Sequence, residues 1–248
     1  MVRKLLVGEV DKVWQEKGVH PFPATLKKEI NMKIQKFTIA GGNPTLLVWG
    51  CPQLQKNQYI KKYLGEVEQI GFVENSNGIT ILKMMGDELC INATLALASQ
   101  LGSQNILLTS GINKLINIQN DQETTFLKIP LTFKRISNKV LFEGIGFICT
   151  DRSIIPTKKM LVTLADKNSK PAFGLIRYQK NKIRPYVYVK RTNSLVEETA
   201  CGSGSIACSI VTGYSEIIHP TGQSILVRQR DDIFIVGAKV VKIGESYE

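Results

Sequence analysis

The sequence predicts an α+β fold of two related halves, each with strands wrapped around one central helix. Three observations support this fold class. Short β-rich runs and alanine-rich helical segments alternate in the order strands, helix, strands, helix, strands. Each of the two central helices follows a cysteine, Cys90 in the first half and Cys201 in the second. The 248 residues are enough for one large domain or two small ones with sizeable cores.

In the first part of the chain, apolar patterns and turn residues indicate strands that lead to the first helix. Met32 opens a strand, and the turn at 41–45 leads into the next one. An amphipathic helix is predicted over 53–68, and Asn77-Gly78 is typical of a hairpin turn. The helix after Cys90 should run to about residue 101. The predicted strands are 33–39, 46–49, 69–74 and 79–85.

The second part repeats this order. Short β-rich runs predominate from 105 to 149, and strand and helix pieces are predicted around Pro156, over 154–165. The helix after Cys201 should end near Thr212. The predicted strands are 173–178 and 184–189, followed by a closing meander of 224–228, 233–236 and 239–243.

Cys201 begins the most informative stretch, in which two glycines flank a serine directly after the cysteine. Backbone N–H groups at a helix start are unpaired and carry the positive end of the helix dipole. Gly202 and Gly204 leave the main chain open to close approach by an anion. Because the same field favours a thiolate, we expect the pKa of Cys201 to lie below the roughly 8.5 of a free cysteine. The alternative interpretation is a buried, inert cysteine beside a glycine turn.

The same arrangement occurs at Cys90, which opens the first alanine-rich helix. Asn92 stands two places after Cys90, as Ser203 stands two places after Cys201. Two cysteines at two helix starts suggest related halves that face each other. Between them we expect a carboxylate-binding site with one sulfur on either side.

Such a pair of thiols suits inversion at the Cα of an amino acid. A thiolate on one face removes the Cα proton, and a thiol on the other face delivers one. The helix starts would bind the carboxylate and stabilise the charge that spreads into it as the proton leaves. The scheme requires no metal and no pyridoxal phosphate, and the sequence contains no metal-ligand cluster or recognisable cofactor lysine. We therefore expect no cofactor.

Composition narrows the classes of partner. The formal charge is +11, but Lys and Arg are dispersed, and no aromatic-interleaved RNA motif or zinc finger is present. We expect a small amino-acid substrate rather than nucleic acid. No apolar run reaches the roughly 20 residues of a membrane helix, so no membrane contact is expected. Five cysteines, odd in number and without a disulfide pattern, favour a cytoplasmic location.

Three further features have more local interpretations. Residues 1–31, broken by Gly18, Pro21 and Pro23, form an accessory extension, or else the natural start is Met32. Asn43 can hold a polar group of a ligand where two strands cross, although an Asn in a Gly/Pro turn is more often structural. The other cysteines are expected in structural positions; they are Cys51, Cys149 and Cys208.

Five stretches of the chain match one family, at 42–48, 68–74, 88–94, 194–204 and 222–227. They include Glu-Leu-Cys-Ile-Asn-Ala-Thr around Cys90 and Glu-Thr-Ala-Cys-Gly-Ser-Gly around Cys201. On these residues the chain resembles the diaminopimelate epimerase fold family, the pyridoxal-phosphate-independent racemases with two cysteines. The stretches with Thr45 and Glu68 resemble its histidine racemase branch, of staphylopine-type metallophore biosynthesis.

The resemblance implies a homodimer and a closed cleft between two pseudo-symmetric halves, with Cys90 and Cys201 as base and acid. The predicted first half is 32–135, joined by a returning strand at about 237–248, and the second half is 136–236.

The resemblance also implies how substrate would be held. Backbone N–H groups near Asn92 and near Gly202-Ser203 would bind the α-carboxylate, and Asn43 would line the site. Glu68 and Glu198 would contact the substrate's ammonium or side chain. Alternatively, Glu198 only complements the dipole of the second helix.

Two departures from the family leave alternatives open. The family usually has glycine directly after the first cysteine, where this chain has Ile91, which crowds the helix start. Ile91 therefore indicates altered substrate choice or an inactive carboxylate-binding homologue. The segment 190–193 has no carboxylate where diaminopimelate epimerase carries Glu-Arg, which argues against that substrate. Other amino-acid racemases stay open, as does a phenazine-biosynthesis-type isomerase, although such isomerases do not rely on a cysteine pair.

Overall fold

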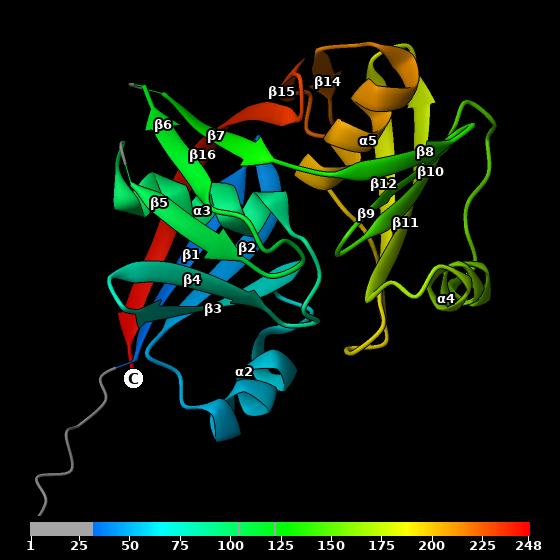
Figure 1. The fold of residues 1–248 in the computed structure, drawn as a ribbon. Helices are drawn as coiled ribbons and strands as arrows, with labels where there is room; N and C mark the ends of the chain where they lie inside the picture. The colour runs from blue at the N-terminus through cyan, green and yellow to red at the C-terminus, as the bar shows by residue number, and fades with distance from the viewer. Residues whose placement is uncertain (1–31, 104, 122) are drawn as a thin grey trace, which may run out of the picture. The chain divides into compact units, whose positions relative to one another are not determined.

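The chain divides into two units, Met1–Ile30 and Asn31–Glu248. The computed structural model describes residues 32–103, 105–121 and 123–248 (Figure 1). The predicted extension, residues 1–31, lies outside these described residues. In the described part of the chain, strands predominate and a few helices accompany them, which confirms the predicted α+β class.

The first part of the sheet closes into a ring around α3 (Ile91–Leu101) (Figure 1). The ring closes because β16 (Ile233–Tyr247) pairs with β7 on one side and with β1 on the other. All of residues 91–98 are buried, and a helix that is apolar on every side is stable only inside a core. The remaining strands of the ring are β1 (Lys33–Ile39), β2 (Gly42–Trp49), β3 (Gln69–Ser76), β4 (Ile79–Met84), β5 (Ile106–Thr109), β6 (Ile116–Asn120) and β7 (Thr124–Pro130).

The sheet continues from β16 into a second set of strands, which surrounds α5 (Gly202–Thr212). Residues 202–208 of α5 are buried. The helix α4 (Lys158–Lys167) packs against β11 and β12 and begins at Thr157, whose hydroxyl accepts the Met160 N–H. The strands are β8 (Phe133–Ile136), β9 (Lys139–Phe142), β10 (Gly146–Thr150), β11 (Ala172–Gln179), β12 (Lys182–Val189), β13 (Ser194–Glu197), β14 (Glu216–Ile218) and β15 (Ser224–Arg230).

Several predicted elements are confirmed. Asn77 and Gly78 join β3 to β4 with φ values of 50° and 78°, as a tight hairpin turn requires. Both central helices begin directly after their cysteines and end where predicted. Gly213 terminates α5 in the left-handed region, at φ 81°.

Three predicted elements were wrong in part. The segment 53–68 is a short 3-10 helix, η1 (Gln53–Gln55), and then α2 (Lys56–Tyr63); Gly65, at φ 119°, cannot continue a helix. No strand lies in 154–157, where the chain leads directly to α4. The closing meander has two strands instead of three, because β16 runs straight through Gly237. The Phe126 ring packs over that glycine, and a Cβ there would lie 2.3 Å from the ring.

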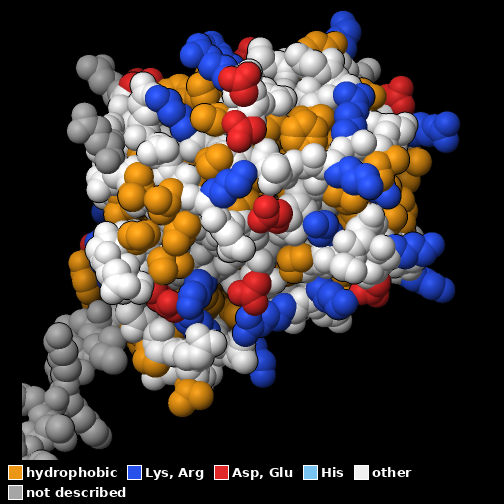
Figure 2. All heavy atoms as spheres, in the orientation of Figure 1, with side chains coloured by type: hydrophobic (Ala, Val, Ile, Leu, Met, Phe, Trp, Pro, Cys, Tyr) orange, Lys and Arg blue, Asp and Glu red, His pale blue; other side chains and the backbone are white. Residues whose placement is uncertain are grey.

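The predicted boundaries of the halves, 32–135 and 136–236 with 237–248 returning, stay a prediction. Figure 2 shows Lys and Arg side chains scattered over one face, with acidic and apolar side chains between them. Within the part of the chain that the structure describes, no helix combines the length and the apolar character needed to cross a bilayer.

Candidate active site

The two cysteines occupy equivalent positions at the two helix starts. Cys90 (φ −120°, ψ 103°) and Cys201 (φ −146°, ψ 104°) are the N-cap residues of α3 and α5. Each sulfur accepts the N–H of the residue three places on, at 3.3 Å. Four places on, Thr94 and Ser205 donate their hydroxyls back to the cysteine carbonyls, at 2.7 and 2.8 Å. The repeated motif therefore forms the same local structure twice.

The two helix starts meet through Asn92. Its amide nitrogen donates to the Ala200 carbonyl at 2.8 Å, and its amide oxygen accepts the Gly202 N–H at 2.8 Å. Ile91 packs against the same glycine, since a Cβ on Gly202 would lie 2.6 Å from Cγ2 of Ile91. The Gly202 N–H, predicted to bind a carboxylate, is thus occupied by Asn92 in this closed arrangement.

A glutamine connects the Cys90 thiol to the Glu198 carboxyl. The Cys90 thiol donates to Oε1 of Gln69 at 2.6 Å, and Nε2 of Gln69 donates to Oε1 of Glu198 at 2.9 Å. Oε2 of Glu198 is buried and has no hydrogen-bond partner among the described residues. When the carboxyl is ionised, this oxygen can accept a hydrogen bond from a ligand ammonium.

Asn43 and Glu68 hold the two sets of strands together. The Asn43 amide donates to Glu68 at 2.7 Å and to the Ala200 carbonyl at 2.9 Å, and its oxygen accepts the Thr45 hydroxyl. Glu68 also accepts the Thr199 hydroxyl, at 2.7 Å. Asn43 is fully buried, so the described geometry assigns it a structural bond network.

A cavity of about 20 Å³ lies between these groups, which is room for about one water molecule. It is lined by three carboxyls and, among the described residues, by no Lys or Arg. A ligand larger than a water molecule therefore fits only if the lining residues move apart. The lining residues are Glu68, Gln69, Met85, Glu88, Leu89, Cys90, Ile145, Val187, Val189, Ser194, Val196, Glu198 and Ser203.

The predicted low pKa of Cys201 was wrong for this closed state. Burial raises the pKa of the Cys201 thiol well above its usual range, and the nearby Glu198 carboxyl raises it further. Burial likewise raises the pKa of Cys90. The N–H groups at the helix starts lower both values, but the loss of hydration outweighs them. Both sulfurs are neutral thiols here.

Burial acts in the same direction on the carboxyls. It raises the pKa of Glu88 to about 7 and that of Glu198 to about 8, and the charge of Glu68 contributes to the latter. The pKa of Glu68 is also raised by burial, against the hydrogen bonds from Thr199 and Asn43. Raised pKa values of thiols and carboxyls are what a dry site without a cationic ligand favours.

The structure brings the predicted site residues close together, but only some of them line the cavity: Cys90, Glu68, Glu198 and Ser203. The others are not among its lining residues and bond or pack beside it: Asn43, Ile91, Asn92, Cys201 and Gly202. Gly204 lies behind Cys201, to whose sulfur it donates its N–H.

The sequence interpretation did not identify four residues that lie at this candidate site. Gln69 follows Glu68 at the start of a predicted strand, and Glu88 precedes Cys90 by two places, as Thr199 precedes Cys201. Their places beside the motifs are the only sequence signal. His219, one of two histidines in the chain, carries no local signal at all.

Known proteins of similar sequence were identified for this chain. No protein-family model matches the chain. A histidine racemase of Fusobacterium nucleatum subsp. nucleatum is 28% identical to it, over 83% of this chain and 93% of that protein. A histidine racemase of Staphylococcus aureus is 22% identical, over 66% of this chain and 74% of that protein.

Solved structures share the fold. A PhzF-family phenazine biosynthesis protein of Bacillus anthracis has a TM-score of 0.59 at 11% identity, over 88% of this chain and 99% of that one. A hydroxyproline epimerase of Agrobacterium vitis has a TM-score of 0.59 at 7% identity, over 90% of this chain and 93% of that one. The chain therefore has the fold that these PhzF-family and epimerase structures share. It is an isomerase of the racemase and epimerase class.

Proposed function

We propose that this isomerase is a cofactor-independent amino-acid racemase that inverts Cα by a two-thiol mechanism. The observation that carries the proposal is the pair of cysteines at two helix starts that meet through Asn92. One sulfur, as thiolate, takes the Cα proton, and the other, as thiol, delivers a proton to the opposite face. Backbone N–H groups at the helix starts stabilise the carboxylate as charge develops in it.

Substrate binding supplies the charge that the closed site lacks. An amino acid carries an ammonium group, which the free oxygen of Glu198 can accept. A cation beside the thiols lowers their pKa and thereby favours the thiolate. In this proposal, deprotonation of a cysteine is coupled to the arrival of substrate.

Histidine is the proposed substrate. The relatives named histidine racemase support it. The cavity supports it as well, because its three carboxyls suit a substrate with an ammonium and an imidazole. A diaminopimelate epimerase is disfavoured, since a second substrate carboxylate would find no Lys or Arg among the described lining residues. The homodimer and the place in metallophore biosynthesis stay predictions.

The test is exchange of the Cα proton in D₂O. The purified protein, dialysed against EDTA and without added pyridoxal phosphate, is incubated separately with L-histidine, D-histidine, diaminopimelate, hydroxyproline and alanine. NMR reads Cα deuteration, and chiral chromatography reads inversion. We expect both with histidine from either enantiomer. Exchange that needs a restored metal or pyridoxal phosphate would contradict the two-thiol mechanism, and no exchange with any amino acid would favour a binding protein.

A further inference from the structure

A buried imidazole lies against the main chain of Cys201. His219 follows β14, and only 3% of it is exposed. Its Nδ1 accepts the Cys201 N–H at 3.3 Å, so this nitrogen carries no proton. Nε2 lies 2.9 Å from the Ser205 hydroxyl, whose single proton is donated to the Cys201 carbonyl. His219 therefore carries its proton on Nε2. Together, His219 and Ser205 form hydrogen bonds with the backbone N–H and the backbone carbonyl of Cys201.

Among the described residues, Cys90 has no matching pair of hydrogen bonds to its backbone N–H and carbonyl. Thr94 matches Ser205 in donating to its cysteine carbonyl, but its neighbour is the hydroxyl of Thr109, at 3.3 Å. No acceptor for the Cys90 N–H is found among residues 32–103, 105–121 and 123–248. The two cysteines thus share a local conformation but differ in what holds their backbones.

We propose that His219 is a positioning residue that sets the direction of the Cys201 thiol. The proposal rests on the racemase function above. The bonds to the Cys201 N–H and carbonyl restrict its backbone to the observed N-cap conformation, which holds its sulfur at the start of α5. A displacement of about 1 Å can cost about 100-fold in rate, so His219 should matter for proton transfer through Cys201 and not through Cys90.

The protonation state of His219 suits this role over a wide pH range. Burial lowers its pKa to about 3, so the ring is neutral and keeps Nδ1 available as an acceptor. A protonated ring would present two donors and would lose its bond with the Cys201 N–H.

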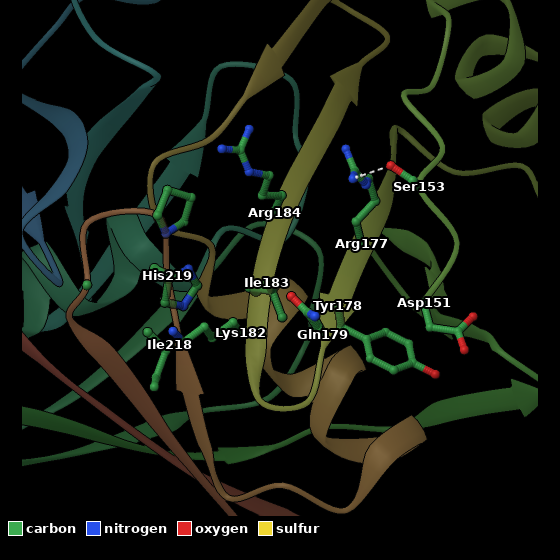
Figure 3. Close-up of a pocket in the computed structure, with 12 residues that line it drawn as sticks. Asp151, Ser153, Arg177, Tyr178, Gln179, Lys182, Ile183, Arg184, Ile218 and His219 are labelled. Atoms are coloured by element: carbon green, nitrogen blue, oxygen red, sulfur yellow. Dashed lines mark hydrogen bonds between the residues drawn. The ribbon is translucent and has the colours of Figure 1, made fainter.

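The position of His219 also offers a route for chemical rescue. It contributes to the wall of a cavity of about 610 Å³, which is also lined by Arg177, Lys182, Arg184 and Ile218 (Figure 3). Imidazole added to the solution can reach the vacated space through this cavity.

The experiment compares His219→Leu, which removes the acceptor, with His219→Asn, whose side-chain oxygen can replace Nδ1. Cα exchange in D₂O is measured from each enantiomer of histidine, and Cys90→Ser and Cys201→Ser establish which enantiomer depends on which sulfur. We expect His219→Leu to slow the Cys201-dependent exchange about 10- to 100-fold and the Cys90-dependent exchange less than about threefold. His219→Asn should retain the Cys201-dependent rate within about threefold, so that its loss is smaller than that of His219→Leu. Thr109→Val is the matched control and should leave that rate unchanged.

A second readout does not depend on racemase activity. Iodoacetamide labelling at each cysteine is followed by mass spectrometry without substrate, and His219→Leu should change the Cys201 rate at least about threefold relative to Cys90. His219→Gly should recover Cys201 behaviour on addition of imidazole, unless Ser205→Ala is also present. Equal effects on both cysteines, or equal losses in the Asn and Leu variants, would overturn the proposal. A selective labelling change in a protein that racemises nothing would instead refute the proposed function and keep the positioning role.

Discussion

Cys90 and Cys201 are held as neutral thiols by their burial, although each lies at a helix start that favours the thiolate. A two-thiol racemase needs one of each form, and it needs to exchange them when the reaction reverses. In the proposed mechanism the substrate decides which form each sulfur takes, because its ammonium supplies the charge that favours a thiolate. The sulfur that faces the Cα proton would then be the base.

The first prediction concerns this exchange of roles. Serine in place of cysteine can still donate a proton but is a far weaker base. Cys90→Ser and Cys201→Ser should each lose racemisation by at least about 10²- to 10⁴-fold. Each should also lose Cα exchange more severely from one enantiomer, and the preferred enantiomer should be opposite in the two variants. NMR in D₂O measures this directly. Equal losses from both enantiomers would indicate that the cysteines shape the site without transferring protons.

The second prediction concerns Ile91, which fills the space beside Gly202. Ile91→Ala should destabilise the protein by about 2–5 kcal/mol, because it leaves a cavity in a fully buried position. The added room should raise the ratio of histidine to alanine exchange rates, read by NMR in D₂O. Ile210→Ala, in the same kind of helix but away from the site, should lower stability without changing the ratio. An unchanged ratio of exchange rates in Ile91→Ala would show that Ile91 does not determine which substrate is used.

The residues that α3 and α5 contribute to the candidate site lie at their first turns. Their starts face each other across Asn92, and each places a sulfur at its N-cap. Beyond these first turns, residues 95–98 and 206–208 are buried and contribute core packing. The unpaired backbone N–H groups of a helix lie only at its start, so the rest of each central helix can be apolar and buried.

The third prediction follows from the facing helix starts. Treatment with diamide, which takes two electrons and two protons from a pair of thiols, should link Cys90 to Cys201 and abolish activity. Dithiothreitol should restore it. Non-reducing peptide mapping identifies the pair. Cys90→Ala should prevent both the link and the reversible inactivation, and a link that instead joins other cysteines would contradict the proposed geometry.

The described part of the molecule is closed by bonds between distant segments. Asn43, Glu68 and Thr199 connect the ring around α3 to the strands around α5. With a cavity of only about 20 Å³, catalysis requires opening and closing of this junction. The buried carboxyls Glu88 and Glu198 make the closed, empty state sensitive to pH.

The fourth prediction is a loss of stability as the pH rises from 6.5 to 8. Unfolded carboxyls ionise near 4.3, whereas burial raises the pKa of Glu88 to about 7 and of Glu198 to about 8. The stabilisation is complete below about pH 4.3, and it is lost as the pH rises to the folded values. Each carboxyl contributes up to about 1.4 kcal/mol per pH unit. His219 is neutral in the folded state, and its imidazole in the unfolded state loses its proton around pH 6.5, so its small opposing slope fades above about pH 7.

The measurement is the melting temperature of the substrate-free protein across this window, which should fall by about 2–4 °C for each kcal/mol. Glu198→Gln should flatten the curve, while Glu66→Gln, on the exposed surface, should leave it as in the wild type. A melting temperature that is constant or rises from pH 6.5 to 8 would show that these carboxyls are already ionised in the folded state.

Much of the fold was predictable because its signals are local. The cysteine motifs, the hairpin at Asn77-Gly78 and the two central helices depend on residues a few places apart, and the structure has them where expected. The same motifs identified Cys90 and Cys201 as N-cap residues. Two separate strands were predicted where β16 is one, because a glycine usually interrupts a strand. Gly237 is tolerated inside β16 because the ring of Phe126, distant in the chain, packs over it.

The charge state of the site was not predictable in this way. A helix start and a nearby glycine are visible in the sequence, and they indicated a thiolate at Cys201. Burial is not visible there, because it depends on strands from both ends of the chain that exclude water together, and its effect on the pKa outweighs that of the helix. His219 and Gln69 escaped for the same reason, since each acquires its role from a cysteine that only folding brings within hydrogen-bond distance.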